Sequence, residues 1–133
     1  MSYSNYASQA NKYREREIVA ASPAKLVVIV YDHVLSSLMR ARAAGDAKNI
    51  ELRLDSLGRA RAGIMELLAT LDVDKGGALG VNLRSIYGFV FTQLMDESRN
   101  PEAKRLERLI AIVTDLRDAF ATIGADSAQV SAA

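Results

Sequence analysis

The stretch DAKNIELRLDSLGRARAGIMELLATLDVDKGG, residues 46–77, decides the fold class because it contains a whole amphipathic helix with a start and a stop. Six of its large apolar residues recur at steps of three, four or seven, which places them on one face of an α-helix. They are Ile50, Leu54, Leu57, Ile64, Leu68 and Leu71. Asp46 is a suitable N-terminal cap, and the run 72–77 has the composition of a turn. We therefore expect a helix between these two points.

A second helix is expected before this stretch, from Pro23 to about Ala44. Ser22 followed by Pro23 is a typical helix start, and Gly45 is a typical stop. The opening run 26–31, LVVIVY, is also compatible with a buried strand when taken by itself. The helical spacing continues beyond it, which favours a helix, through Val34, Leu35, Leu38 and Met39.

Two more helices are expected after the turn at 72–77. One spans about 78–97 and carries on one face Leu79, Leu83, Ile86, Tyr87, Val90 and Leu94. The run Asn100-Pro101-Glu102 is a cap followed by proline, so it predicts the next helix start. That last helix is expected to end at Gly124, and its apolar face consists of Leu106, Leu109, Ile110, Val113, Leu116, Phe120 and Ile123.

Four helices of about 20 residues, each near 30 Å long, with short connections, predict an all-α protein. Short connections make sequential helices antiparallel, so the expected architecture is an up-down four-helix bundle with an N-terminal arm. Residues 1–17 are polar and form the arm. Residues 18–124 form the bundle, and residues 125–133, rich in small side chains, are expected to be a flexible tail.

Composition argues against several classes of function. The 133 residues include 17 basic and 16 acidic side chains, without the basic excess of a nucleic-acid-binding protein. The absence of cysteine removes disulfides and thiolate chemistry. The longest run of large apolar residues, 26–31, is too short for membrane insertion, and residues 1–17 lack the apolar core of a signal peptide. We therefore expect a cytoplasmic protein that does not bind nucleic acid and does not insert into a membrane.

No motif indicates catalysis or a bound metal. His33 is the only histidine, whereas metal sites in bundles use Glu-x-x-His pairs on facing helices. Asp32 faces another side of the same helix. The turn 72–77 lacks the ligand spacing of a calcium loop and the Gly-Lys-Ser/Thr ending of a phosphate loop. We expect no cofactor and no enzymatic activity.

Several large apolar residues lie away from the predicted core faces. Relative to Val90, a rotation of about 100° per residue places Phe89 and Phe91 on the two flanks of the third helix and Met95 further round. Leu52 and Ile112 are displaced in the same way. Wide apolar faces in a compact bundle explain these positions, but so does an exposed groove for a partner. We take Phe89, Phe91 and Met95 as candidate groove residues.

Glycines inside the helices have the same two explanations. Gly58, Gly63 and Gly88 each lower helix stability by about 1 kcal/mol relative to alanine at an exposed position. Either close helix packing or the close approach of a bound chain accounts for them.

The order of short motifs resembles that of the FliS family of flagellar secretion chaperones. The segment 21–26, Ala-Ser-Pro-Ala-Lys-Leu, followed by an apolar run and Tyr31-Asp32, is similar to the family signature, which includes Ala21, Ser22, Pro23 and Leu26. Further similar pieces are residues 59–67, Leu71-Asp72 before Gly76-Gly77, Asn82-Leu83, Ile86-Tyr87, and residues 116–119. The chain departs from the family where it has Phe120 in place of a common Trp and Tyr-Gly-Phe-Val at 87–90.

The resemblance implies a cytosolic export chaperone without enzymatic activity. Such a protein binds the disordered C-terminal segment of flagellin, prevents premature polymerisation and delivers it to the flagellar type III export gate. Ser22 and Pro23 then set the helix start, whereas Leu26 and Tyr31 belong mainly to the core. The candidate client-binding residues are Tyr6, Tyr13, Tyr31, Tyr87, Phe89, Phe91 and Met95. Tyr6 and Tyr13 are expected to anchor the arm over the groove when no client is bound.

Two alternatives remain at this point. A different helical adaptor or regulator, serving another client or secretion substrate, has the same sequence features. A homodimer that exchanges its first helix or its arm is also compatible with a bundle that has an exposed groove.

Overall fold

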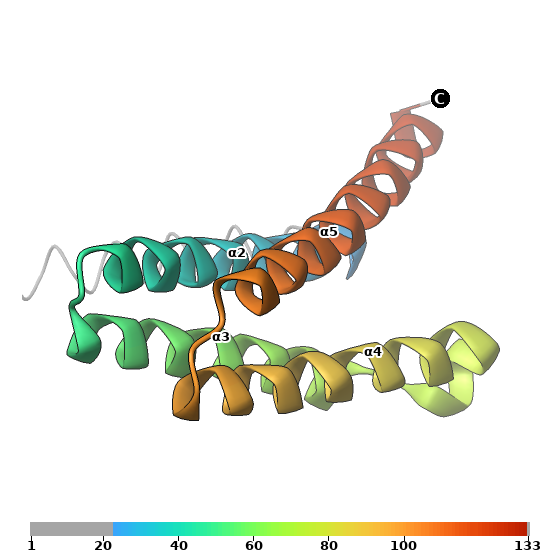
Figure 1. The fold of residues 1–133 in the computed structure, drawn as a ribbon. Helices are drawn as coiled ribbons and strands as arrows, with labels where there is room; N and C mark the ends of the chain where they lie inside the picture. Colours follow the sequence, from blue (N-terminus) through green and yellow to red (C-terminus); the bar gives the residue numbers. More distant parts are fainter. Residues whose placement is uncertain (1–22, 133) are drawn as a thin grey trace, which may run out of the picture.

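The computed structural model describes residues 23–132, except for the side chains of Val73, Lys75 and 125–132. These residues form four helices, α2 (Pro23–Asp46), α3 (Ile50–Thr70), α4 (Val73–Arg99) and α5 (Ala103–Ala132). Figure 1 shows two layers, with α2 and α5 lying over α3 and α4. Sequential helices run antiparallel, which confirms the all-α bundle; the arm, residues 1–17, lies outside the described range.

The core lies between the two layers and is closely packed. Gly63 of α3 lies against α2, where an added Cβ would come within 2.5 Å of a methyl carbon of Val34. Close helix packing therefore explains the glycine at position 63. At Gly88, no atom lies near enough to require a glycine. The large side chains of the core are Tyr31, Val34, Leu38, Leu57, Ile64, Leu67, Leu83, Tyr87, Val90, Leu94, Leu106, Leu109 and Val113.

The start of α3 differs from the prediction. Asn49, not Asp46, caps the helix, since its side-chain oxygen accepts a hydrogen bond from the backbone N–H of Leu52 at 3.2 Å. Asp46 is the last residue of α2. The turn between the two helices uses Lys48 at a positive φ of 58°, and the cap of α3 lies three residues beyond the predicted one.

The buried face of α3 is also rotated from the predicted one. Ile50 is 66% exposed and Leu54 is exposed as well, although both belong to the predicted apolar face. Small side chains take part in the contact instead, because they let α2 approach closely. The buried residues of α3 are Ser56, Leu57, Ala60, Gly63, Ile64 and Leu67.

The predicted turn before the third helix is present at Gly77. This residue has φ 56° and ψ −135°, which interrupts α4 after its first turn. Such a conformation favours glycine because a side chain would be strained there. Beyond it, the predicted core positions from Leu83 to Leu94 are buried or half-buried, while Leu79 is exposed.

The predicted helix end at Gly124 is wrong, because α5 continues to Ala132. Gly124 is buried against the start of α2, where an added Cβ would lie 3.4 Å from Cγ of Lys25. The glycine therefore marks a close approach of two helices rather than a stop. The continuation of α5 includes most of the segment that we expected to be a separate tail.

Candidate binding groove between α4 and α5

An open groove separates the middle of α4 from the middle of α5. Its volume is about 460 Å³, and it is lined by Ser85, Ile86 and Phe89 of α4 and by Ile112, Asp115 and Leu116 of α5. Four of these six side chains are apolar. Phe89 is 52% exposed, so its ring is available to a partner. We call this feature the α4/α5 groove.

The turn that joins α4 to α5 is closed by Glu97. This carboxylate is buried, and its two oxygens accept hydrogen bonds from the backbone N–H of Glu102 at 2.6 and 3.1 Å. It also forms an ion pair with Arg105 at 3.5 Å. Arg53 of α3 donates to the backbone carbonyl of Glu97 at 3.0 Å. The end of α4 is thus bonded to the start of α5 and to α3.

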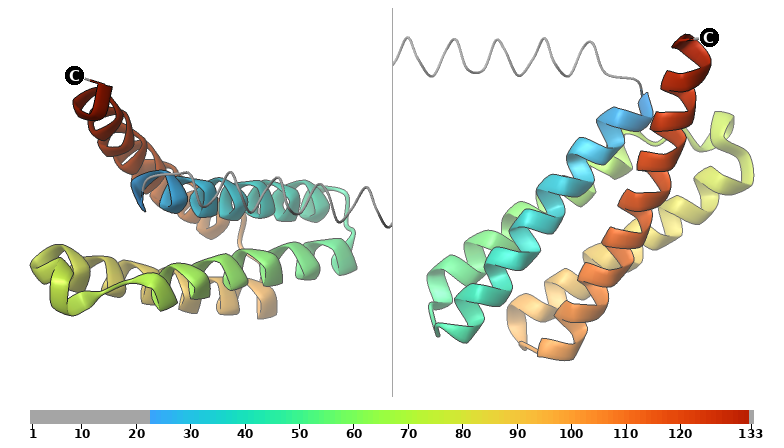
Figure 2. Two further views of the ribbon diagram at one scale, coloured as in Figure 1. Left: turned by 180° about the vertical axis from the view of Figure 1, so that it is seen from behind. Right: turned by 90° about the horizontal axis from the view of Figure 1, so that it is seen from above.

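Away from this turn, α5 diverges from α4. Figure 1 and the left view of Figure 2 show the C-terminal half of α5 rising away from the layer of α3 and α4. Leu79 lies seven residues before Ile86, and Ile123 lies seven residues after Leu116. Each therefore shares the helix face of its lining neighbour. Both are exposed, so they extend the apolar walls toward the open end.

Three aromatic side chains fill the interior behind the groove. Tyr31 of α2 packs against Tyr87 of α4 and Phe120 of α5, with ring centroids 6.3 and 5.6 Å apart. The hydroxyls of Tyr31 and Tyr87 form a buried hydrogen bond with each other. Burial raises the pKa of both tyrosines. Both hydroxyls therefore stay protonated and neutral at physiological pH.

An ion pair holds α2 to α5 beside this cluster. Arg117 donates from Nε to an oxygen of Asp32 at 2.8 Å. Three pieces of sequence that resemble the FliS family are joined by these contacts: Tyr31-Asp32 of α2, Ile86-Tyr87 of α4 and residues 116–119 of α5. Their chemistry is structural, because the rings and the ion pair connect helices that are distant in the sequence. Ile86 and Leu116 of these pieces also line the groove.

The structure places Phe89 in the groove but does not bring Phe91 and Met95 to it. Ser98 lies seven residues after Phe91 and shares its face of α4, where it accepts a hydrogen bond from Arg61 of α3 at 2.8 Å. Phe91 and Met95, both half-buried, therefore lie on the α3 side of α4. Ile112, which we predicted to be displaced from the core face of its helix, lines the groove together with Phe89.

The remaining predicted site residues lie in the core or outside the described range. Tyr31 and Tyr87 are almost completely buried, so neither offers a surface to a client. Pro23 begins α2, and Leu26 is half-buried. The residues outside the described range are Tyr6, Tyr13, Ala21 and Ser22.

Sequence reasoning missed Glu97, Ser85 and Asp115. Glu97 carries a usable signal, since it lies seven residues after Val90 and three after Leu94, on the core face of its helix. An acidic residue at such a position predicts a buried partner. Ser85 and Asp115 carry no comparable signal, because polar residues on the flank of a helix are common.

The comparison with known proteins decides the family. The model of the flagellar protein FliS family matches residues 6–127. The chain belongs to the FliS family. A flagellar secretion chaperone FliS from Vibrio cholerae is 26% identical over 119 residues, covering 90% of this chain and 88% of the relative. The FliS of Salmonella typhimurium is 26% identical over 111 residues, covering 82% of each chain. That of Campylobacter jejuni is 28% identical over 110 residues, covering 83% of this chain and 86% of the relative.

The described part of the chain has neither a membrane-spanning helix nor a cluster of metal-ligating side chains. Over residues 23–132, none of the helices combines the length and apolar character needed to span a membrane. The described side chains include no group of three or more His, Cys, Asp or Glu residues placed to hold a metal ion.

Proposed function

We propose that this FliS-family protein is a cytosolic export chaperone that binds the disordered C-terminal segment of flagellin in the α4/α5 groove. The observation that carries this proposal is the apolar lining of the groove, which includes the half-exposed Phe89. Membership of a family whose relatives are named flagellar secretion chaperones supports the choice of client class. Covering the segment would prevent premature polymerisation, and the complex would deliver it to the type III export apparatus.

The shape of the groove fits a helical segment. The two walls diverge from the turn closed by Glu97, so a helix lying between them contacts α4 on one side and α5 on the other. Ile86 and Phe89 supply one apolar wall, and Ile112 and Leu116 supply the other. A disordered client loses conformational entropy when it folds on binding, so it needs a long apolar contact. The exposed Leu79 and Ile123 lengthen this contact toward the open end.

The arm is the second part of the proposal. Residues 1–17 would cover part of the α4/α5 groove in the absence of client, with Tyr6 and Tyr13 as anchors. Tyrosine suits this role because its ring supplies contact area and its hydroxyl stays hydrated. The arm is otherwise polar, so the client's longer apolar stripe would displace it.

A matched pair of substitutions tests the proposed groove. Phe89→Ala is expected to weaken binding of the flagellin C-terminal segment by about 2 kcal/mol, the loss typical of a central interface residue. Met65→Ala is the control, because Met65 of α3 is also 52% exposed but does not line the groove. Both variants should fold normally, since surface substitutions change stability by about 0.5 kcal/mol or less.

Calorimetric titration of each folded variant with a peptide of the flagellin C-terminal segment measures the effect. Equal affinities for Phe89→Ala, Met65→Ala and the unmodified chain would place the client elsewhere on the bundle.

A further inference from the structure

The lining of the α4/α5 groove includes one charged side chain, that of Asp115. Asp115 of α5 is exposed, and no described residue forms a hydrogen bond or ion pair with it. Its neighbours one helical turn away are Ala111, Ile112, Asp118 and Ala119, and none of them is a cation. The other polar side chain of the lining is that of Ser85 on α4, which is neutral.

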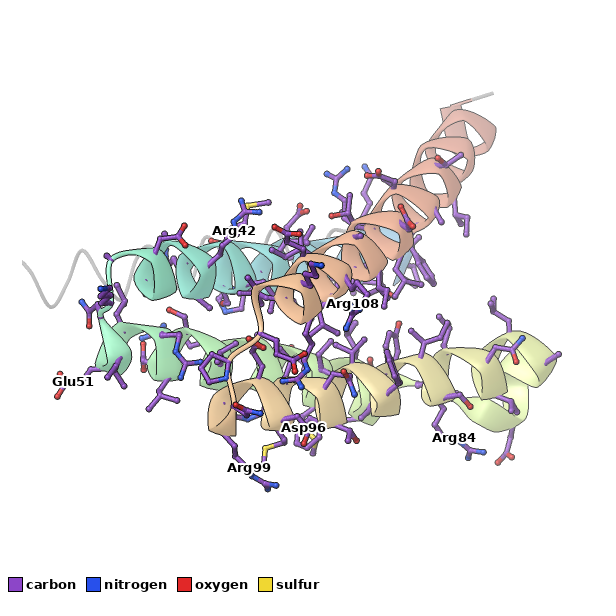
Figure 3. All side chains as sticks on the ribbon, in the orientation of Figure 1. Arg42, Glu51, Arg84, Asp96, Arg99 and Arg108 are labelled. Atoms are coloured by element: carbon purple, nitrogen blue, oxygen red, sulfur yellow. The ribbon has the colours of Figure 1, made fainter. Side chains whose placement is uncertain are left out.

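The nearest basic residues do not neutralise Asp115. Arg117 is bonded to Asp32 at 2.8 Å and to Asp118 at 3.4 Å. Arg84, the neighbour of Ser85 in α4, points away from α5 (Figure 3). Arg108 lies seven residues before Asp115 on α5, a rise of about 10 Å, too far for a direct ion pair.

A client that fills this groove would remove water from Asp115. An ionised carboxylate without a partner is costly in an apolar contact, whereas a cation placed beside it forms a charge-assisted hydrogen bond. We infer that the groove selects a helical client segment in which a lysine or arginine pairs with Asp115. This inference rests on the proposed function, and it adds a chemical requirement on the client.

The position of Asp115 also sets where the basic residue must stand in the client. Ile112 and Leu116 flank Asp115 along α5, so the cation approaches between two apolar contacts. The client helix therefore carries its lysine or arginine at the edge of its apolar stripe, within one turn of apolar residues on both sides. A wholly apolar segment would leave the carboxylate unpaired, so it would bind more weakly.

Charge exchange tests the inference with the full-length chain. The probe is the C-terminal segment of flagellin, together with variants in which each lysine and arginine is replaced in turn by glutamate. Asp115→Asn is expected to weaken binding of the unmodified segment about three- to tenfold at low salt. Asp115→Lys should weaken it further, and one glutamate variant of the segment should regain affinity for Asp115→Lys. Glu66→Gln is the control, because it removes one exposed negative charge from α3, which does not line the groove.

The possible outcomes separate this inference from the proposed function. If the unmodified chain binds the segment and Asp115→Asn binds it equally well or more tightly, the pairing with Asp115 is overturned and the export-chaperone proposal stands. If the unmodified chain fails to bind the segment, the proposed function itself is overturned. Three results together support the pairing. Asp115→Asn binds the segment more weakly, Glu66→Gln binds it as the unmodified chain does, and one glutamate variant of the segment regains affinity for Asp115→Lys.

Discussion

At the scale of the residue, Tyr31 shows what a sequence pattern predicts and what it leaves open. Its place in the apolar run of α2 indicated a core position, and it is fully buried. Its hydrogen bond with Tyr87 was not predictable, because that contact depends on the relative rotation of α2 and α4. The two tyrosines satisfy each other, and no buried side-chain oxygen or nitrogen among the described residues lacks a hydrogen bond.

Removing one hydroxyl of the tyrosine pair should destabilise the bundle. Tyr31→Phe leaves the hydroxyl of Tyr87 buried without a partner, so we expect the free energy of unfolding to fall by about 1–3 kcal/mol. The double variant Tyr31→Phe/Tyr87→Phe removes both polar groups and should cost less than the two single losses added together. Urea unfolding at neutral pH measures these differences, and strict additivity would contradict the coupling.

The same pair predicts how stability depends on pH. Because burial raises the pKa of both tyrosines in the folded chain, the unfolded chain releases its tyrosine protons first, near pH 10. The stabilisation by the neutral pair is therefore complete below about pH 10 and is lost as the pH rises further. In the double variant, the free energy of unfolding should decline less steeply above this pH than in the unmodified chain, as measured by unfolding at a series of pH values. A decline as steep as in the unmodified chain would show that other groups cause it.

At the scale of the element, the helices were predictable and their boundaries less so. Apolar spacing located α2 to α5, and turn residues located the connections near Gly45, Gly77 and Pro101. Two boundaries were wrong for different physical reasons. Asp46 has the chemistry of a cap, but the turn at Lys48 makes Asn49 the cap of α3. Gly124 has the chemistry of a stop, but it lies where α5 packs closely against the start of α2. The rotation of α3 was missed because Ala60 and Gly63 carry no apolar signal, although both are buried.

The arm is the element whose proposed role needs its own test. Deleting residues 1–16 removes Tyr6 and Tyr13, so the groove would be open before the client arrives. We expect tighter binding of the flagellin C-terminal segment and a changed binding enthalpy, because no arm has to be displaced. Calorimetric titration of the truncated and full chains measures both quantities. Unchanged affinity and enthalpy would exclude the arm as a cover for the groove.

At the scale of the whole molecule, sequence reasoning predicted a bundle with a binding surface but not the location of that surface. Phe89, Phe91 and Met95 were expected to line one groove, whereas only Phe89 lines it. The groove lies between α4 and α5, and α5 diverges from α4 toward its C-terminal end (Figure 1). At one end of the helix pair, Glu97 bonds the end of α4 to the start of α5. Near the other end, the side chains of Tyr31, Tyr87 and Phe120 fill the interior. These contacts join separate helices, so helical periodicity alone does not predict them.

The most direct test of the account compares flagellin with and without its C-terminal segment. Calorimetric titration of the unmodified chain with monomeric full-length flagellin, with the isolated segment and with flagellin that lacks it would locate the binding determinant. The account predicts similar affinities for the full-length protein and the isolated segment, and no binding to the truncated protein. Binding of truncated flagellin as tight as that of the full-length protein would contradict the claim that this chaperone-family bundle works by holding the C-terminal segment.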